Sequence, residues 1–150
     1  MNIFRTQAIS IFLAFMALSM VPTAYAAERE WDQTSVLQIS DKLVSAARRL
    51  HIECRTSPPD YLASEGSYNH IDFKYHVRHF LSVAYDLSEA IENGDGERET
   101  RPIYKELTNI LVDLHRYAGG KRSQAWPLVD NAVAKVSSIL DDLNTYYSIG

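Results

Sequence analysis

Cysteine is almost missing from this chain of 150 residues, in which Cys54 is the only one. An internal disulfide is therefore impossible, and so is the Cys-x-x-Cys-His attachment of a c-type haem. A single free cysteine usually behaves as a small hydrophobic residue, so we expect Cys54 to be buried. The alternative is that Cys54 joins two chains through a disulfide, which an oxidising compartment would permit.

Catalytic motifs and positive charge are scarce as well. The sequence contains no His-Glu-x-x-His or Glu-x-x-His motif, no Gly-x-Ser-x-Gly elbow and no glycine-rich phosphate loop. We therefore expect the protein not to be an enzyme. Lysine and arginine number 15 against 19 aspartates and glutamates, which gives a net charge of −4. Such a chain has no electrostatic reason to bind nucleic acid or an anionic membrane.

The first 26 residues have the order of a secretory signal peptide. Arg5 is their only charged side chain, and it precedes an apolar run from Ala8 to Val21 that Pro22 ends. Ala24 and Ala26 then supply the small residues of a signal-peptidase site. The run of 14 residues is short for a membrane span, although an uncleaved anchor is the alternative.

Cleavage after Ala26 would divide the chain into a signal peptide, residues 1–26, and a mature protein, residues 27–150. The length of the mature part suits a single domain with one core. We expect this domain to be periplasmic or secreted, with no membrane span of its own.

The mature part holds four segments in which apolar residues recur every three or four positions, the spacing of amphipathic helices. The first is expected to open with a capping box from Ser35 to Gln38, and the third with Pro102, which suits a first helical turn. The expected helices run from Ser35 to about Cys54, from His70 to Asn93, from Pro102 to about Tyr117, and from Ser123 or Pro127 to Tyr147.

Seven-residue repeats and short glycine-containing links in the last three segments are typical of antiparallel neighbours. Together with the first segment, they predict an all-α fold, an up-down-up-down four-helix bundle after a cleaved N-terminal signal peptide. A three-helix core with a loose first segment is the alternative. The residues expected to point inward are Leu43, Val77, Phe80, Leu87, Ile110, Leu114, Val133, Val136, Leu140 and Leu143.

Two histidines, His76 and His79, lie three residues apart in the second expected helix. Asp72 falls on the same flank, so Asp72, His76 and His79 could together bind zinc, copper or nickel. Such a site would need a further ligand from a neighbouring helix. We favour the simpler hypothesis without a cofactor, in which His76 is partly buried and paired with Asp72. His79 is then mostly exposed, with no ligating partner from another helix.

Haem is a further alternative for the histidines. Methionine–histidine ligation is excluded in the mature part, because all three methionines of the chain precede residue 21. Ligation by His76 and His115 remains open. The cofactor alternative is therefore a metal- or haem-binding periplasmic bundle that uses His76 and His79.

Tyrosine and tryptophan are plentiful in the mature part, with eight and two residues against two phenylalanines. These side chains combine a large apolar area with a polar tip and are enriched at interfaces. Tyr61 and Tyr68 lie in the long link before the second helix, and Tyr75 points about 160° away from Phe73. We expect these three tyrosines to contact a protein partner. The protein itself would then be an immunity or inhibitor protein, or an accessory subunit of an envelope complex. Its oligomeric state stays open.

Overall fold

The computed structural model describes residues 29–56, 68–118 and 127–147, and all regular structure in these residues is helical. The all-α prediction is therefore confirmed. The expected signal peptide, residues 1–26, lies outside the described residues. The helices are α1 (Gln33–Thr56), α2 (Tyr68–Glu92), α3 (Glu97–Ala118) and α4 (Pro127–Asn144).

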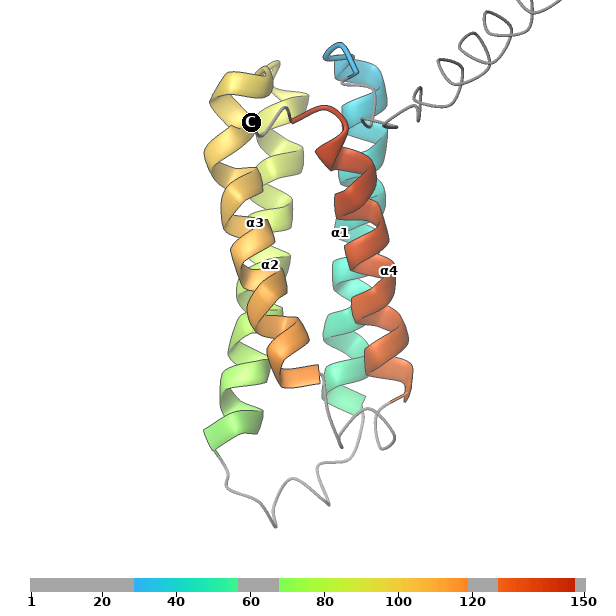
Figure 1. The fold of residues 1–150 in the computed structure, drawn as a ribbon, viewed down its shortest axis with the longest axis vertical. Helices are drawn as coiled ribbons and strands as arrows, with labels where there is room; N and C mark the ends of the chain where they lie inside the picture. The colour runs from blue at the N-terminus through green and yellow to red at the C-terminus, as the bar shows by residue number, and fades with distance from the viewer. Residues whose placement is uncertain (1–28, 57–67, 119–126, 148–150) are drawn as a thin grey trace, which may run out of the picture.

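The four helices lie side by side along the long axis of the molecule (Figure 1). α1 contacts α2 and α4, α2 contacts α3, and a sparser contact joins α3 to α4. Contacts between α1 and α2 run in opposite order along the two helices, since Asp41 meets Ser88 whereas Arg48 meets Tyr85. Because α1 packs against two neighbours, the alternative of a loose first segment is wrong.

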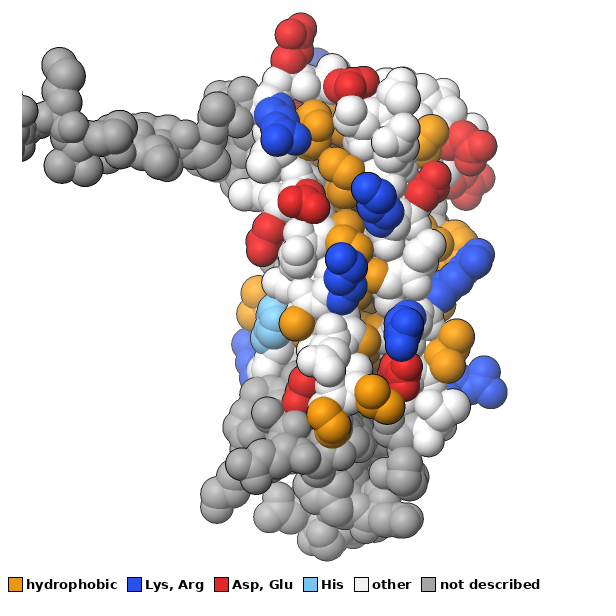
Figure 2. Space-filling view, turned by 90° about the vertical axis from the view of Figure 1, so that its right-hand side faces the viewer, with side chains coloured by type: hydrophobic (Ala, Val, Ile, Leu, Met, Phe, Trp, Pro, Cys, Tyr) orange, Lys and Arg blue, Asp and Glu red, His pale blue; other side chains and the backbone are white. Residues whose placement is uncertain are grey.

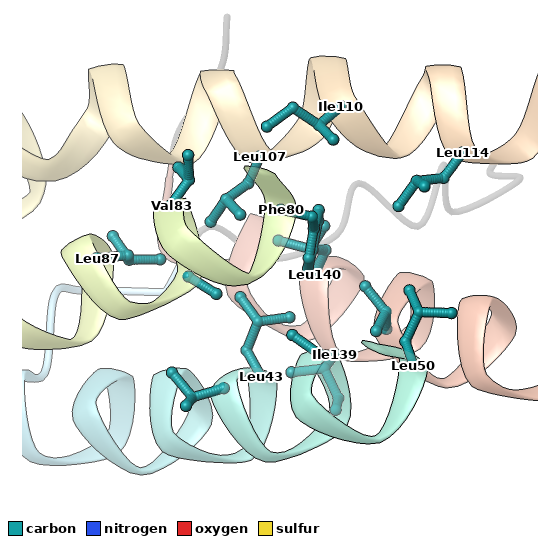
Figure 3. Packing of buried hydrophobic residues seen from close by; sticks show 14 of the residues in the cluster. Leu43, Leu50, Phe80, Val83, Leu87, Leu107, Ile110, Leu114, Ile139 and Leu140 are labelled. Carbon is teal, nitrogen blue, oxygen red and sulfur yellow. The ribbon is translucent and has the colours of Figure 1, made fainter. Parts of the chain in front are cut away.

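One cluster of buried side chains from all four helices forms the core. Figure 3 shows Leu43, Phe80 and Leu140 converging from three of these helices, with Leu107 entering from the fourth. Each of the ten residues expected to point inward is buried, with at most 5% of its surface exposed. Cys54 is also buried, as predicted, and burial raises the pKa of its thiol. A buried, protonated thiol is poorly suited to a disulfide between chains.

α1 begins two residues before its predicted start, at Gln33, and Asp32 caps it. The Thr34 amide donates to Asp32 Oδ1 at 3.1 Å, and the Ser35 hydroxyl donates to Asp32 Oδ2 at 2.6 Å. These hydrogen bonds, chiefly those from Ser35, lower the pKa of the Asp32 carboxyl. The predicted capping box from Ser35 to Gln38 is wrong, because a carboxylate three residues earlier takes the capping position and suits the positive end of the helix dipole.

A tight turn separates α2 from α3. The Gly94 N–H donates to the Ile91 carbonyl and the Asp95 N–H to the Ala90 carbonyl, both at 3.0 Å. These are the two bonds of a Schellman C-cap. Gly94 has a φ of 97°, a conformation that residues with a Cβ rarely adopt. The turn therefore makes α2 and α3 neighbours and fixes which of their residues lie level with each other.

α3 begins at Glu97, one and a half turns before the predicted start at Pro102, which lies inside the helix. The Thr100 N–H donates to the Gly96 carbonyl at 3.1 Å, which closes the first turn. Glu97 and Glu99 place negative charge at the positive end of the helix dipole. The predicted start was wrong because it gave weight to the proline and overlooked this acidic first turn.

Aromatic side chains close the end of the molecule where the first turns of α3 meet the end of α4. Tyr147 stacks on Tyr104 with ring centroids 4.2 Å apart, and Trp31 packs edge-on against Tyr147 at 5.5 Å. The Tyr147 hydroxyl donates to Thr100 Oγ1 at 2.9 Å, and the Tyr104 hydroxyl donates to Asn144 Oδ1 at 3.1 Å. This aromatic cluster (Trp31, Tyr104 and Tyr147) has its buried hydroxyls satisfied, as a stable interior requires.

The aromatic cluster should make stability fall at alkaline pH. Burial raises the pKa of Tyr104 and of Tyr147 to about 12. An unfolded tyrosine has a pKa of about 10, so between about pH 10 and pH 12 the unfolded chain loses protons that the folded chain keeps. The free energy of unfolding should therefore decrease as the pH rises through this window.

Denaturant unfolding at a series of pH values between 9 and 12 measures this decrease. Tyr104→Phe should make the decrease shallower than in the wild type. A slope equal to that of the wild type would contradict the role given to Tyr104.

Candidate functional site

The structure describes the side chain of one of the three tyrosines predicted to contact a partner. Tyr61 lies outside the described residues, and so does the side chain of Tyr68. Tyr75 is 63% exposed, whereas Phe73 on the opposite side of α2 is 2% exposed. The predicted exposure of Tyr75 is confirmed, and the candidate site is built around this residue.

Two histidines lie close to Tyr75 on α2. The Tyr75 ring centroid lies 5.8 Å from that of His76, in an edge-on arrangement, and 6.0 Å from that of His79. His79 is four residues after Tyr75 and is therefore its neighbour one turn along the helix. His76 is half-buried, as predicted. These three residues form the Tyr75 patch, which offers aromatic faces together with hydroxyl and imidazole hydrogen-bonding groups.

His79 is joined to the neighbouring helix. Its Nε2 lies 3.0 Å from Glu106 Oε1 on α3, and 38% of the histidine side chain is exposed. The contact with Glu106 was not predicted, and the prediction that His79 is mostly exposed is wrong. The turn at Gly94 explains the contact. His79 and Glu106 are separated from this turn by similar numbers of residues, so they lie at the same height along the two helices. A surface pair of this kind contributes about 1 kcal/mol or less, and its main effect is to orient the imidazole.

The predicted metal ligands are not gathered into a ligand set. Asp72 is half-buried on α2, one turn before His76. Within residues 29–56, 68–118 and 127–147, no group of three or more His, Cys, Asp and Glu side chains could hold a metal ion. The pairing of Asp72 with His76 stays a prediction. His115 is exposed on α3, and its joint ligation of haem with His76 also stays a prediction.

The large exposed hydrophobic side chains are spread over all four helices. Figure 2 shows the face formed by α1 and α4, where hydrophobic side chains lie in a strip among lysine and arginine side chains. No helix in the described part of the chain is long and apolar enough to cross a membrane. Of the large exposed hydrophobic side chains in the described residues, Tyr75 is the most exposed. The others are Ile52, Tyr85, Val112 and Leu128.

A groove between α1 and α2 was not predicted. The Arg48 guanidinium lies over the Tyr85 ring, 5.1 Å from its centroid, and donates to the Tyr85 hydroxyl. The Ser88 hydroxyl donates to Asp41 Oδ1 at 2.9 Å. The groove depends on which turn of α1 lies beside which turn of α2, and the long link between them leaves that register open. Its volume is about 510 Å³, and its lining residues are Asp41, Val44, Ser45, Arg48, Tyr85, Ser88, Glu89 and Glu92.

Comparison with known proteins finds no family model, no curated protein and no solved structure that matches the chain. The function must therefore be inferred from the geometry of the described side chains.

Proposed function

We propose that the protein is a small exported helical bundle that binds a protein partner through the Tyr75 patch. The observation that carries this proposal is the 63% exposure of Tyr75, whose ring lies beside those of His76 and His79. Tyrosine offers a large contact area at low conformational cost and is enriched among the residues that dominate binding energy. Binding of this kind needs no catalytic group, and we propose no enzymatic activity.

The helix that carries the patch is firmly held. Phe73 and Val77, on the inner side of α2, are 2% and 1% exposed, so this part of the helix is anchored in the core. The contact between His79 and Glu106 adds a link to α3. A preorganised surface loses less entropy when it binds, which favours affinity. A toxin blocked by an immunity or inhibitor protein, or a larger subunit of an envelope complex, would be a fitting partner.

Export and helix direction are part of the same proposal. The mature domain, residues 27–150, is an up-down-up-down four-helix bundle that is released from a signal peptide, residues 1–26, into the periplasm or the medium. The tight turn at Gly94 and the opposite order of contacts along α1 and α2 support this alternation. The Arg29 N–H donates to the Thr145 carbonyl at 2.9 Å, so cleavage after Ala26 would leave the attachment of Arg29 intact.

The mature protein should begin at Ala27. Intact-mass spectrometry of the protein recovered from the cell envelope or the medium measures this directly. Ala26→Phe places a large side chain at the cleavage site and should leave the uncleaved precursor. An intact Met1 on the wild-type protein in the envelope fraction would contradict the signal-peptide assignment.

A partner should be captured by the tagged mature protein from an envelope extract, in a stoichiometric amount that mass spectrometry identifies. Tyr75→Ala should abolish or strongly reduce this capture. Tyr85→Ala is the matched control, because it removes another exposed tyrosine of α2 that lies outside the Tyr75 patch. Equal capture by the two variants would mean that the Tyr75 patch is not the binding surface.

A further inference from the structure

The face shared by α1 and α2 carries opposite charges at its two ends. At one end, the carboxylates of Asp41, Glu89 and Glu92 line the groove. Glu89 and Glu92 are exposed, and neither forms an ion pair within the described residues. This end of the face is therefore an acidic surface with two uncompensated carboxylates.

The other end of the same face is basic. Arg55 lies seven residues after Arg48 on α1, and Arg78 lies seven residues before Tyr85 on α2, so both repeat the outward direction of the groove residues. Lys74 lies one turn before Arg78. Burial lowers the pKa of His51, and the nearby charges of Arg55 and Arg78 lower it further. Cations from both helices therefore lie near His51. Within the described residues, none of these three cations forms an ion pair.

The hydrogen bond and cation–π contact between Arg48 and Tyr85 lie in the middle of the face. Asp41 and Arg55 are 14 residues apart on α1, which corresponds to about 21 Å along a helix. Arg48 lies halfway between them in the sequence. Two apolar side chains accompany this middle section, Tyr85 at 39% exposure and Ile52 at 57% exposure, one turn after Arg48.

We propose that two copies of this chain dimerise through the α1–α2 face, across a two-fold axis near Arg48 and Tyr85. If the two-fold axis runs across the helices, a residue near one end of the face contacts a residue near the other end of the second copy, and the reverse contact forms as well. The acidic end of each copy then meets the basic end of the other copy, so this pairing of opposite charges forms twice in the dimer. Tyr85 and Ile52 are buried near the axis, and the Tyr85 ring beneath each guanidinium reduces the repulsion between the two Arg48 side chains.

A second copy fits this face better than another partner does. A basic protein would complement Glu89 and Glu92 but would be repelled by Arg55 and Arg78. An acidic protein would complement Arg55 and Arg78 but would be repelled by Glu89 and Glu92. The acidic end carries three carboxylates and the basic end three cations, with Arg48 between the two ends, so the ends of two copies can pair with each other. This inference stands apart from the partner bound at the Tyr75 patch, since Tyr75 contacts His76 and His79 outside the groove.

Sedimentation velocity of the purified exported protein tests the dimer. The wild type should show a monomer–dimer equilibrium that shifts toward monomer in 1 M NaCl, where the Debye length is about 3 Å. Glu89→Lys/Glu92→Lys and Lys74→Glu/Arg78→Glu should each self-associate at least about tenfold more weakly, because each places like charges opposite one another. An equimolar mixture of these two variants should recover the dimer as a heterodimer.

Asp141→Lys/Asp142→Lys is the control. It replaces two exposed aspartates of α4, and it changes the net charge by as much as Glu89→Lys/Glu92→Lys does. It should dimerise like the wild type. A wild type that stays monomeric at the highest concentration reached would overturn the proposal. So would a mixture of the two charge-reversed variants that associates no better than either alone. Tyr85→Ala should weaken the dimer and spare partner capture, so the two proposals can fail independently.

Discussion

Replacing Phe80 with alanine should lower the free energy of unfolding by about 3–5 kcal/mol, the range typical of large aromatic residues in a core. Phe80 is fully buried, and Figure 3 shows it among leucine and isoleucine side chains of the other helices. The substitution removes the ring and leaves a cavity that neighbouring helices fill only in part. A domain of this size has about 5–15 kcal/mol of stability, so the variant should unfold at a much lower denaturant concentration.

Val112→Ala is the matched control for the Phe80 substitution. Val112 is 57% exposed on α3, and its loss should change the free energy of unfolding by about 0.5 kcal/mol or less. Denaturant unfolding followed by circular dichroism compares the two variants. A loss below about 1 kcal/mol for Phe80→Ala would show that the helices do not pack around this residue.

Replacing Tyr147 with alanine should also cost about 3–5 kcal/mol. Tyr147 is 1% exposed, stacks on Tyr104 and packs against Trp31, so three aromatic side chains lose contacts in this one change. Its hydroxyl also bonds to Thr100, near the start of α3. Tyr147 follows the end of α4, so its loss should loosen the closure of this end of the molecule as well as the core.

One further variant separates the ring of Tyr147 from its hydroxyl, and another is a control at an exposed position. Tyr147→Phe removes only the hydrogen bond to Thr100 and should cost about 1 kcal/mol, since the Thr100 hydroxyl still donates to the Gly96 carbonyl. Tyr75→Ala makes the same change as Tyr147→Ala at an exposed position and should cost about 0.5 kcal/mol or less. Equal losses for Tyr75→Ala and Tyr147→Ala would contradict the structural role of the aromatic cluster.

The sequence predicted the core well because helical spacing alone selects the buried face. Residues such as Val77, Phe80 and Leu87 follow one another by three, four or seven positions, and this spacing holds wherever a helix packs against neighbours. The end of α2 was also predictable, because glycine is the residue that stops a helix in a left-handed conformation. These features depend only on residues that are close in the sequence.

Features that depend on contacts between distant residues were missed. Tyr104 was left out of the expected core because Ile103 beside it continues the seven-residue spacing, yet Tyr104 is 2% exposed. Its burial depends on the ring of Tyr147, 43 residues later, and on Asn144 at the end of α4. Helical spacing permits either Ile103 or Tyr104 in the core, and the contacts with α4 decide between them.

The candidate site was predictable in part. The direction of Tyr75 followed from its angle to Phe73, and the half-buried position of His76 followed in the same way. The contact of His79 with Glu106 required the register of α2 against α3, which could have been obtained by counting outward from the turn at Gly94. The groove between α1 and α2 could not be obtained in this way, because a long link rather than a tight turn joins those helices.

The most direct test of the proposed function is the dissociation constant of the captured partner for three forms of the protein, measured by isothermal titration calorimetry. Tyr75→Ala should bind at least about tenfold more weakly than the wild type, equivalent to about 1.4 kcal/mol or more. Tyr85→Ala should bind as the wild type does, and both variants should keep wild-type helicity. Unchanged affinity for Tyr75→Ala, or an equal loss for both variants, would contradict binding through the Tyr75 patch.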